Sequence, residues 1–507
     1  MSKKVDTLKR IYDNRFSLGF YLILIVAAYF FLNNLNTLPP GLSPAEASNA
    51  TLILGILRHS AKYTTLLHNG SAGAVFSVMQ LLSVKIFGPT LFALRLPAAL
   101  IGLFGVALMY VLGTLWYDQR VGVLASLFAA TTPWTVGFSR FGTAAILPII
   151  IVPLVLSALI IAFRQREIGW FIFAGLIIGG SFSAISGLWL AFGLLLSCAT
   201  LLYTLAQKNQ LLERAHLIMF ALIVILGLPL AIWRFSAHPP KLTLSNVNAH
   251  DIATRTADTL TGFVLHGDDN YLYNIPGTPE LNLFVGLMFI VGVLVCGMRF
   301  EKARYRTLLI LFCVLLIPVV ASSQVAPSSE SSIVLAPIVF ILAAVGINYM
   351  LEIWFSTFPI NSAARTLGTV PIVVLLLMGI YQGYQQYFVA WANSPDLADS
   401  FDNNARELAG YLNRTSFGGQ RYVVSTGTSA QIIDFLSFKR AEITDLPMAD
   451  ISKLPIGSPQ KQIIFIPTET SGIIGDLKSR FPKARLSQHY SELNDNTQTF
   501  AVYQTQQ

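Results

Sequence analysis

Residues 91–115 read LFALRLPAALIGLFGVALMYVLGTL, a run of 25 residues with one charged side chain, Arg95. About 20 apolar residues in a helix are enough to cross the hydrocarbon core of a bilayer. Similar runs recur along the 507-residue chain, of which 54% is hydrophobic and only 12% charged. An ordinary soluble domain is about 25% charged, so this composition excludes that class. The pattern predicts an α-helical polytopic membrane protein, because a membrane β-barrel would alternate apolar and polar residues.

We predict about eleven membrane spans. They lie at about 17–32, 91–115, 121–138, 144–163, 168–183, 188–205, 216–235, 281–298, 307–321, 333–351 and 368–389. Residues 74–87 are also apolar, but their length suits an interfacial helix on the outer surface better than a span.

The positions of Lys and Arg predict the orientation of the chain. With a cytoplasmic N-terminus, 15 of the 23 Lys and Arg residues in 1–392 lie in inner segments. Short inner segments of membrane proteins are rich in these residues. The odd number of spans then places the C-terminus outside the plasma membrane. The net charge of +8 is therefore interpreted as a topology signal, and no nucleic-acid partner is expected.

Two domains are predicted from the distribution of charge. Residues 1–392 form the membrane domain, with long outer loops at about 33–90 and 236–280. Residues 393–507 are richer in charge and form a small extracytoplasmic domain. In it, helix-like and strand-like segments alternate, which is typical of an α/β domain. The helix-like segments are 403–415, 429–438 and 471–481, and the strand-like ones are 421–427, 462–468 and 500–505.

The first outer loop contains a helix start with two possible roles. In the stretch 38–47, LPPGLSPAEA, Ser43 is a predicted N-cap, Pro44 the first helical residue and Glu46 the third. This spacing is a capping box, in which Glu46 completes the cap. Alternatively, Glu46 is a carboxylate held at the outer membrane surface as a general base. Both interpretations stay open at this point.

Basic residues follow in the same loop and at the end of a span. Arg58, Lys62 and His68 suit a lipid phosphate, although they could also reach the headgroups of the bilayer. Arg140 ends the third span and has the same two interpretations. Arg95 either contacts a lipid phosphate or the headgroups, as proposed for Arg140, or pairs with an acid inside the helix bundle.

The second outer loop contains paired carboxylates. Asp268 and Asp269 follow His266 and Gly267, and they could coordinate a divalent cation or form a turn. We predict the turn, and therefore no metal or other cofactor. Cys198, Cys296 and Cys313 lie in apolar runs and are interpreted as core residues.

The order of several short motifs resembles a known family. They are the Pro-Gly turn and acidic helix start at 38–47, IFG at 86–88, ALRLPA at 93–98, YVLG at 110–113, PWTVGFSR at 133–140 and GDDNYLYNIPGTP at 267–279. Over about residues 17–350 the chain resembles GT-C glycosyltransferases of the protein mannosyltransferase and aminoarabinose transferase kind (glycosyltransferase family 39-like). The chain departs from that family at Ala45-Glu46, where Asp-Glu is common.

The resemblance implies an inverting transfer of a sugar from a polyprenyl-phosphate donor. The acceptor would be a protein or a cell-envelope glycan or lipid at the outer face. The resemblance assigns the catalytic base to Glu46 and places Arg58 and Arg140 near the lipid phosphate. The remaining candidates for substrate binding are Lys62, His68, Asp268 and Asp269. A second function stays open, in which a degenerate relative or a transporter binds a glycolipid without transferring its sugar.

Overall fold

The computed structural model describes residues 15–67, 73–182, 210–230, 232, 249–322, 326–437, 443–454, 460–470, 472–491 and 498–505. The chain divides into two compact units. The helical unit comprises Met1–Asn33, Ala72–Phe76 and Ala98–Ala390, and the mixed unit comprises Asn34–Ser71, Ser77–Pro97 and Trp391–Gln507. The mixed unit therefore joins most of the first outer loop to the C-terminal residues, whereas the sequence analysis grouped that loop with the membrane domain.

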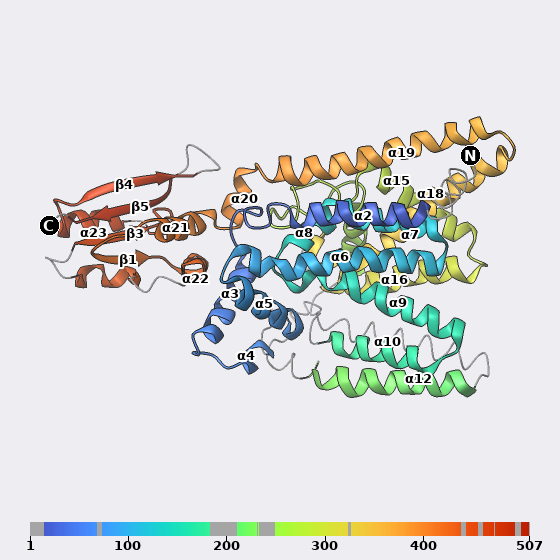
Figure 1. Cartoon of the computed structure of the whole chain (residues 1–507), viewed down its shortest axis with the longest axis horizontal. Helices are drawn as coiled ribbons and strands as arrows, with labels where there is room; N and C mark the ends of the chain where they lie inside the picture. Colours follow the sequence, from blue (N-terminus) through green and yellow to red (C-terminus); the bar gives the residue numbers. More distant parts are fainter. Residues whose placement is uncertain are drawn as a thin grey trace, which may run out of the picture. The chain divides into compact units, whose positions relative to one another are not determined.

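The helical unit consists of helices, most of them apolar, and Figure 1 shows their arrangement. They are α2 (Arg15–Leu32), α7 (Gln119–Thr131), α8 (Pro133–Arg140), α9 (Pro148–Gln165), α10 (Ile168–Ser181), α12 (Gln210–Leu222), α14 (Ala249–Gly262), α15 (Leu283–Met298), α16 (Ala303–Ser322), α17 (Ser329–Ser332), α18 (Ala336–Thr357) and α19 (Ser362–Tyr384). Helix α6 (Leu91–Trp116) begins in the mixed unit and continues into the helical unit.

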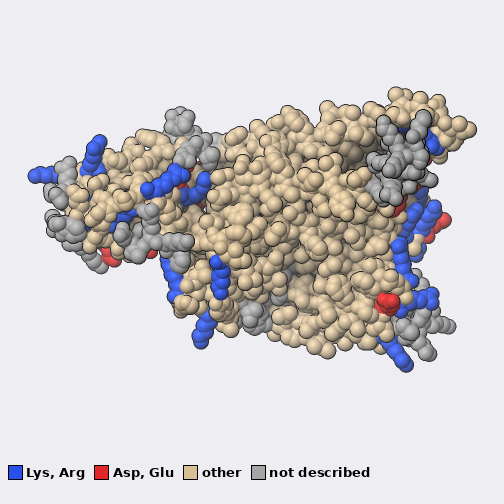
Figure 2. Space-filling model, viewed as in Figure 1, with Lys and Arg blue, Asp and Glu red and all other residues tan. Residues whose placement is uncertain are grey.

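Five helices in the described part of the chain are long and apolar enough to cross a membrane, or six if one bent pair is counted as a span. Five further apolar helices are shorter, with 10–17 residues each. Figure 2 shows that, on the face in view, the flank of the helical unit carries almost no charged side chains. The chain is thus a multi-pass membrane protein, while the total of eleven spans stays a prediction and the expected span at 188–205 lies outside the described residues.

The predicted span at 121–138 is broken, which corrects the sequence analysis. Helices α7 and α8 meet at an angle of 59°. The break lies at Thr132, which has the extended values φ −70° and ψ 128° because the ring of Pro133 disfavours helical geometry in the residue before it. Pro133 then starts α8, where its missing N–H costs no hydrogen bond.

Helices α15 and α18 approach closely because glycine occupies the contact on both sides. A Cβ atom on Gly292 would collide with the backbone oxygen of Leu342, and one on Gly346 with that of Met288. Small residues allow helix backbones in a membrane to come together, and van der Waals packing then holds them. Helix α18 is the most buried of the candidate spans, with 89% of its apolar window inside the protein.

The mixed unit contains a five-stranded sheet in the order β2-β1-β3-β5-β4 (Figure 1). The strands are β1 (Gln420–Val424), β2 (Ile443–Asp445), β3 (Lys461–Phe465), β4 (Arg485–Tyr490) and β5 (Gln498–Gln504). Strands β2, β1 and β3 run parallel, while β5 and β4 are antiparallel to their neighbours. The helices of this unit are α3 (Pro44–Leu57), α4 (Thr64–Leu67), α5 (Ala74–Phe87), α20 (Pro395–Ser400), α21 (Asn403–Arg414), α22 (Gly427–Leu436) and α23 (Ile473–Arg480).

One apolar core of the mixed unit joins distant parts of the sequence. Its buried side chains include Ile53 and Leu54 of α3, Leu408 of α21, Ile432 of α22 and Val502 of β5. A second core lies on the opposite face of the sheet. It contains Ile463 and Phe465 of β3 and Leu477 of α23. All five residues of β3 are buried, as expected for a strand covered on both faces.

Candidate active site

Helix α3 begins with the capping box that the sequence predicts. The Ser43 hydroxyl oxygen accepts a hydrogen bond of 3.3 Å from the backbone N–H of Glu46. In return, the backbone N–H of Ser43 donates one of 2.9 Å to Glu46 Oε2. Pro44 is the first helical residue. Two N–H groups that have no partner inside the helix are satisfied in this way.

Glu46 also forms an ion pair that the sequence does not reveal. Arg95 Nε donates to Glu46 Oε1 at 2.9 Å, and both side chains are fully buried. The same guanidinium donates to the backbone oxygens of Pro39, at 2.8 Å, and of Gly41. Arg95 thus has an acidic partner, as one of its two interpretations predicted. In this conformation both carboxylate oxygens of Glu46 accept hydrogen bonds inside the protein.

The predicted phosphate-binding residues of this loop differ in their surroundings. Arg58 makes a two-pronged contact with Asp434 of α22, with N–O distances of 2.7 and 2.6 Å. This pair is partly exposed, with 43% and 36% of the two side chains accessible. Lys62 is exposed, and His68 lies outside the described residues. Arg58 therefore links α3 to the C-terminal part of the mixed unit.

A cavity of about 420 Å³ lies beside the start of α3 in the mixed unit. Leu42 and Pro44 line it together with the acids Asp402 and Glu469. The hydroxyl oxygen of Ser429 is in contact with both of these carboxylates. A hydroxyl has only one proton to donate, so the Ser429 hydroxyl can donate to one of the two carboxylates, and a hydrogen bond in the second contact would need a proton on the carboxyl group. Burial raises the pKa of Asp402 and of Glu469, which favours such a proton.

Arg140 is buried inside the helical unit. Its Nη1 donates a hydrogen bond of 2.8 Å to the backbone oxygen of Phe30 in α2. Its guanidinium lies 5.5 Å from the ring centre of Tyr387 and 5.1 Å from that of Phe388. The side chain has no exposed surface, which argues against the interpretation in which it reaches the headgroups of the bilayer, while its predicted contact with the lipid phosphate stays a prediction. Arg140 holds α8 against its neighbouring helices.

Asp268 belongs to a buried polar network at the N-terminal ends of α15 and α17. Its two carboxylate oxygens accept hydrogen bonds from the backbone N–H groups of Ser329, at 2.8 Å, and Asn270, at 2.9 Å. The Ser329 hydroxyl donates to Glu280, which is also buried. Burial raises the pKa of Glu280 to about 8, and the nearby charge of Asp268 adds to the rise. Glu280 therefore holds a proton at neutral pH and can donate it.

Asp269 and its neighbours are placed differently from Asp268. Asp269 Oδ1 lies 3.5 Å from His266 Nε2, and both side chains are mostly exposed. Tyr273 donates a hydrogen bond of 2.9 Å to Glu330, and its ring stacks on Phe138 at 5.3 Å. The described residues contain no group of three or more His, Cys, Asp or Glu side chains that could hold a metal ion.

Glu280 and Ser329 were not predicted from the sequence as parts of polar networks at these loops, and for Arg95 an acidic partner was predicted without naming Glu46. Glu280 lies three residues before the apolar helix α15 and could have been noted for that reason, because an acid beside a span is costly unless it is paired. Ser329 carries no such signal, since serine is common in loops. The structure brings Asp268 together with Glu280 and Glu46 together with Arg95.

Comparisons with known proteins bear on the class of the chain. A family model described as dolichyl-phosphate-mannose-protein mannosyltransferase matches residues 72–233. No curated protein matches the chain. Among solved structures, ArnT from Cupriavidus metallidurans in the apo state has a TM-score of 0.58 at 14% identity, covering 97% of this chain and 98% of that one. The same protein bound to undecaprenyl phosphate has a TM-score of 0.56 at 12% identity, with the same coverage.

A more distant match is the oligosaccharyltransferase of Archaeoglobus fulgidus tethered to an acceptor peptide with an NVT sequon. Its TM-score is 0.53 at 12% identity, and the match covers 86% of this chain and 64% of that one. At such identities the likeness concerns the fold. The family model and the shared fold together support a GT-C superfamily glycosyltransferase, which confirms the resemblance read from the sequence.

Proposed function

We propose that this membrane protein transfers a sugar from a polyprenyl-phosphate donor to an acceptor at the outer face of the membrane. The observation that carries the proposal is the fold shared with ArnT along nearly the whole of both chains. One structure of that protein has undecaprenyl phosphate bound. The uncharged flank of the helical unit also suits a long lipid tail (Figure 2).

The proposed reaction is a direct displacement with inversion at the sugar's anomeric carbon. An acceptor hydroxyl oxygen attacks this carbon while the bond to the phosphate oxygen breaks. The hydroxyl proton passes to a carboxylate, and the polyprenyl phosphate leaves with the bonding electrons. Positioning of the two reactants and stabilisation of the developing phosphate charge would supply most of the rate.

Glu46 is the proposed base, and its surroundings define what this role requires. Arg95 and Ser43 already donate to both oxygens of Glu46, so the acceptor hydroxyl would have to reach a remaining lone pair of the carboxylate or replace one of these hydrogen bonds. Active-site hydrogen bonds often rearrange when substrate binds, so this requirement is compatible with general-base catalysis. Asp268 is the alternative base, with its own oxygens bonded to two backbone N–H groups.

The phosphate-binding role falls to the exposed basic side chains. Lys62 is exposed in the first outer loop, and Arg58 is partly exposed beside Asp434. We therefore propose these two residues, and His68 from the sequence pattern, as contacts of the lipid phosphate. Arg140 is assigned to packing because its guanidinium is enclosed by Phe30, Tyr387 and Phe388.

A second candidate function is binding of a glycolipid without transfer. Two observations favour it: Ala45 stands where the resembled family often has aspartate, and Glu46 is fully engaged in a cap and an ion pair. A chain that had lost its base would keep the fold and the lipid site. This function predicts donor binding with no turnover.

The experiment that separates these functions combines transfer and binding on the purified protein. A panel of polyprenyl-phosphate sugars is offered with water-soluble glycan and peptide acceptors, and both sugar transfer and donor affinity are measured. Transfer supports the enzyme, whereas donor binding without transfer across the panel supports the binder. Asp268→Asn should lower transfer if Asp268 is the base, and Asp476→Asn, at an exposed acid of α23 outside the candidate site, is its control.

A further inference from the structure

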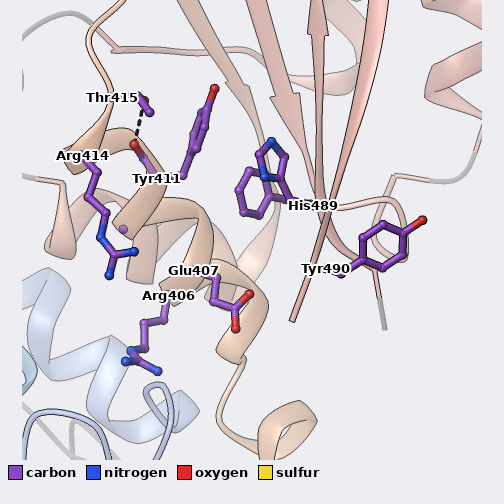
Figure 3. A pocket seen from close by; sticks show the side chains of 9 residues that line it. Arg406, Glu407, Tyr411, Arg414, Thr415, His489 and Tyr490 are labelled. Carbon is purple, nitrogen blue, oxygen red and sulfur yellow. Dashed lines mark hydrogen bonds between the residues drawn. The ribbon is translucent and has the colours of Figure 1, made fainter. Parts of the chain in front are cut away.

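A cavity of about 230 Å³ in the mixed unit is lined by none of the site residues that the sequence predicts (Figure 3). Helix α21 supplies one wall with Arg406, Glu407, Tyr411 and Arg414. Strand β4, at the edge of the sheet, supplies His489 and Tyr490, and β5 supplies Phe500. The residues of this cavity are called the α21 pocket below.

Three aromatic rings form the apolar part of the α21 pocket. His489 stacks on Phe500, with ring centres 4.4 Å apart and an angle of 9° between the planes. Tyr411 lies 5.0 Å from His489 and 5.3 Å from Phe500. Burial lowers the pKa of His489, which favours the uncharged form of its ring. Flat, uncharged rings of this kind pack well against the C–H face of a sugar ring.

The polar part of the α21 pocket combines donors with one acceptor. Arg406 and Arg414 are eight residues apart in α21, which places them just over two helical turns from each other. Arginine presents a rigid set of donors that matches carboxylate and phosphate groups. Glu407 lies in the same wall, where its Oε1 accepts hydrogen bonds from Asn403, at 2.8 Å, and Ser491, at 3.3 Å. Figure 3 shows these α21 side chains on one side and His489 with Tyr490 on the other.

Gly410 lies between the two arginines and is not required by packing. A Cβ atom at this position would meet no heavy atom within 4 Å. Glycine inside a helix costs about 1 kcal/mol of stability relative to alanine. The helix therefore accepts a cost at a position where a side chain would fit, and the absence of that side chain keeps the pocket open between Arg406 and Arg414.

We propose that the α21 pocket binds an anionic saccharide. The arginines contact its phosphate or carboxylate group, the aromatic rings pack on the sugar ring, and Glu407 accepts hydrogen bonds from its hydroxyl groups. Binding in the α21 pocket does not require the transfer reaction to take place. The identity of the ligand rests on the proposed function: it is the acceptor of the transfer reaction, or the part of that acceptor that carries the negative charge.

The test measures binding to the full-length purified protein in detergent, with no transfer required. Four probes are titrated by ligand-observed NMR: glucose 1-phosphate, glucuronic acid, glucose and inorganic phosphate. The two anionic sugars are expected to bind at least about tenfold more tightly than glucose or inorganic phosphate, because only they engage both parts of the pocket. Equal binding of inorganic phosphate and glucose 1-phosphate would overturn the saccharide assignment.

Two matched pairs of variants test whether the anionic sugars bind in the α21 pocket. Arg414→Ala should weaken the anionic sugars at least about tenfold, whereas Arg485→Ala, an exposed arginine of β4 outside the pocket, should not. Gly410→Trp should block binding, and Gly475→Trp, at a helix position that is equally open, should not. The pocket is refuted if Arg414→Ala binds like the wild type or if both members of either pair lose binding together. Retained binding in a protein that transfers no sugar contradicts only the proposed function.

Discussion

The substitution Glu46→Gln removes one charge from the buried pair with Arg95 and keeps the shape of the side chain. Glutamine is accepted in a capping box, so the helix cap persists. The guanidinium of Arg95 is then left as a buried cation without its counter-charge, and breaking a buried pair in this way costs about 3–5 kcal/mol. In a unit of 150–250 residues each kcal/mol lowers the melting temperature by about 2–4 °C, so we expect a drop of about 6–20 °C.

The same unit offers a control for this measurement. Asp434→Asn breaks the Arg58–Asp434 pair, which is similar in geometry but partly exposed. Exposed pairs contribute at most about 1 kcal/mol, so this variant should melt within about 4 °C of the wild type. Scanning fluorimetry in detergent compares the three proteins. A melting temperature for Glu46→Gln that matches that of Asp434→Asn would refute the argument from burial.

The rate of sugar transfer by the folded fraction of the Glu46→Gln protein then distinguishes the two roles of Glu46. If Glu46 acts only in the cap and the ion pair, Glu46→Gln should transfer sugar normally at a temperature well below its melting point. If Glu46 is the base, transfer should fall by about 10²–10⁴-fold, because an amide cannot take the proton of the acceptor hydroxyl. Normal transfer by folded Glu46→Gln would move the base to another carboxylate, with Asp268 the first to test.

Four further predictions follow from the structure. Because burial raises the pKa of Glu280 to about 8 from 4.5, the folded chain retains a proton that the unfolded chain releases. The contribution of Glu280 to stability should therefore be fully present below pH 4.5 and be lost as the pH rises to about 8, and the pH dependence of the melting temperature should differ in Glu280→Gln by this contribution. Arg140→Ala should lower the melting temperature and leave donor affinity unchanged, since the Arg140 side chain is fully buried against Phe30 and Phe388; weaker donor binding would return it to the lipid site. Gly292→Leu should abolish folded protein on size-exclusion chromatography, because α15 and α18 could no longer meet, while Gly169→Leu, at an open position of α10, should not. A topology reporter fused after Gln507 should be active outside the cytoplasm, and activity only inside would reverse the predicted orientation.

Local sequence patterns predicted much of the secondary structure. The cap at Ser43 and the strands β1, β3 and β5 were predicted because each has a clear apolar or capping pattern. Strand β4 was missed because its sequence RLSQHY is mostly polar, as suits an exposed edge strand. Strand β2 was missed because it has only three residues. The break at Thr132 had a signal in Pro133, which the apolar run around it concealed.

The candidate site was predicted less well because its contacts join residues far apart in the sequence. Glu46 meets Arg95 and Glu280 meets Ser329, in each case across 49 positions. A periodic pattern reports which face of an element is buried, but it does not report which element covers that face. The burial of Arg140 shows the same limit. Its place at the end of a span suggested a lipid phosphate or the headgroups, and only the fold reveals Phe30 and Tyr387 around it.

The discontinuous mixed unit has a consequence for the synthesis of the chain. Its first part ends at Pro97 and its last part begins at Trp391, so a ribosome must add almost 300 residues between them. At about 5–20 residues per second, helix α3 waits roughly 15–60 s for the segments that complete its core. During that time the side chains of Ile53 and Leu54 lack partners such as Ile432 and Val502. A chain that stops before β5 would keep this apolar face uncovered, so quality-control proteases should detect truncation at the C-terminus through the exposed first outer loop.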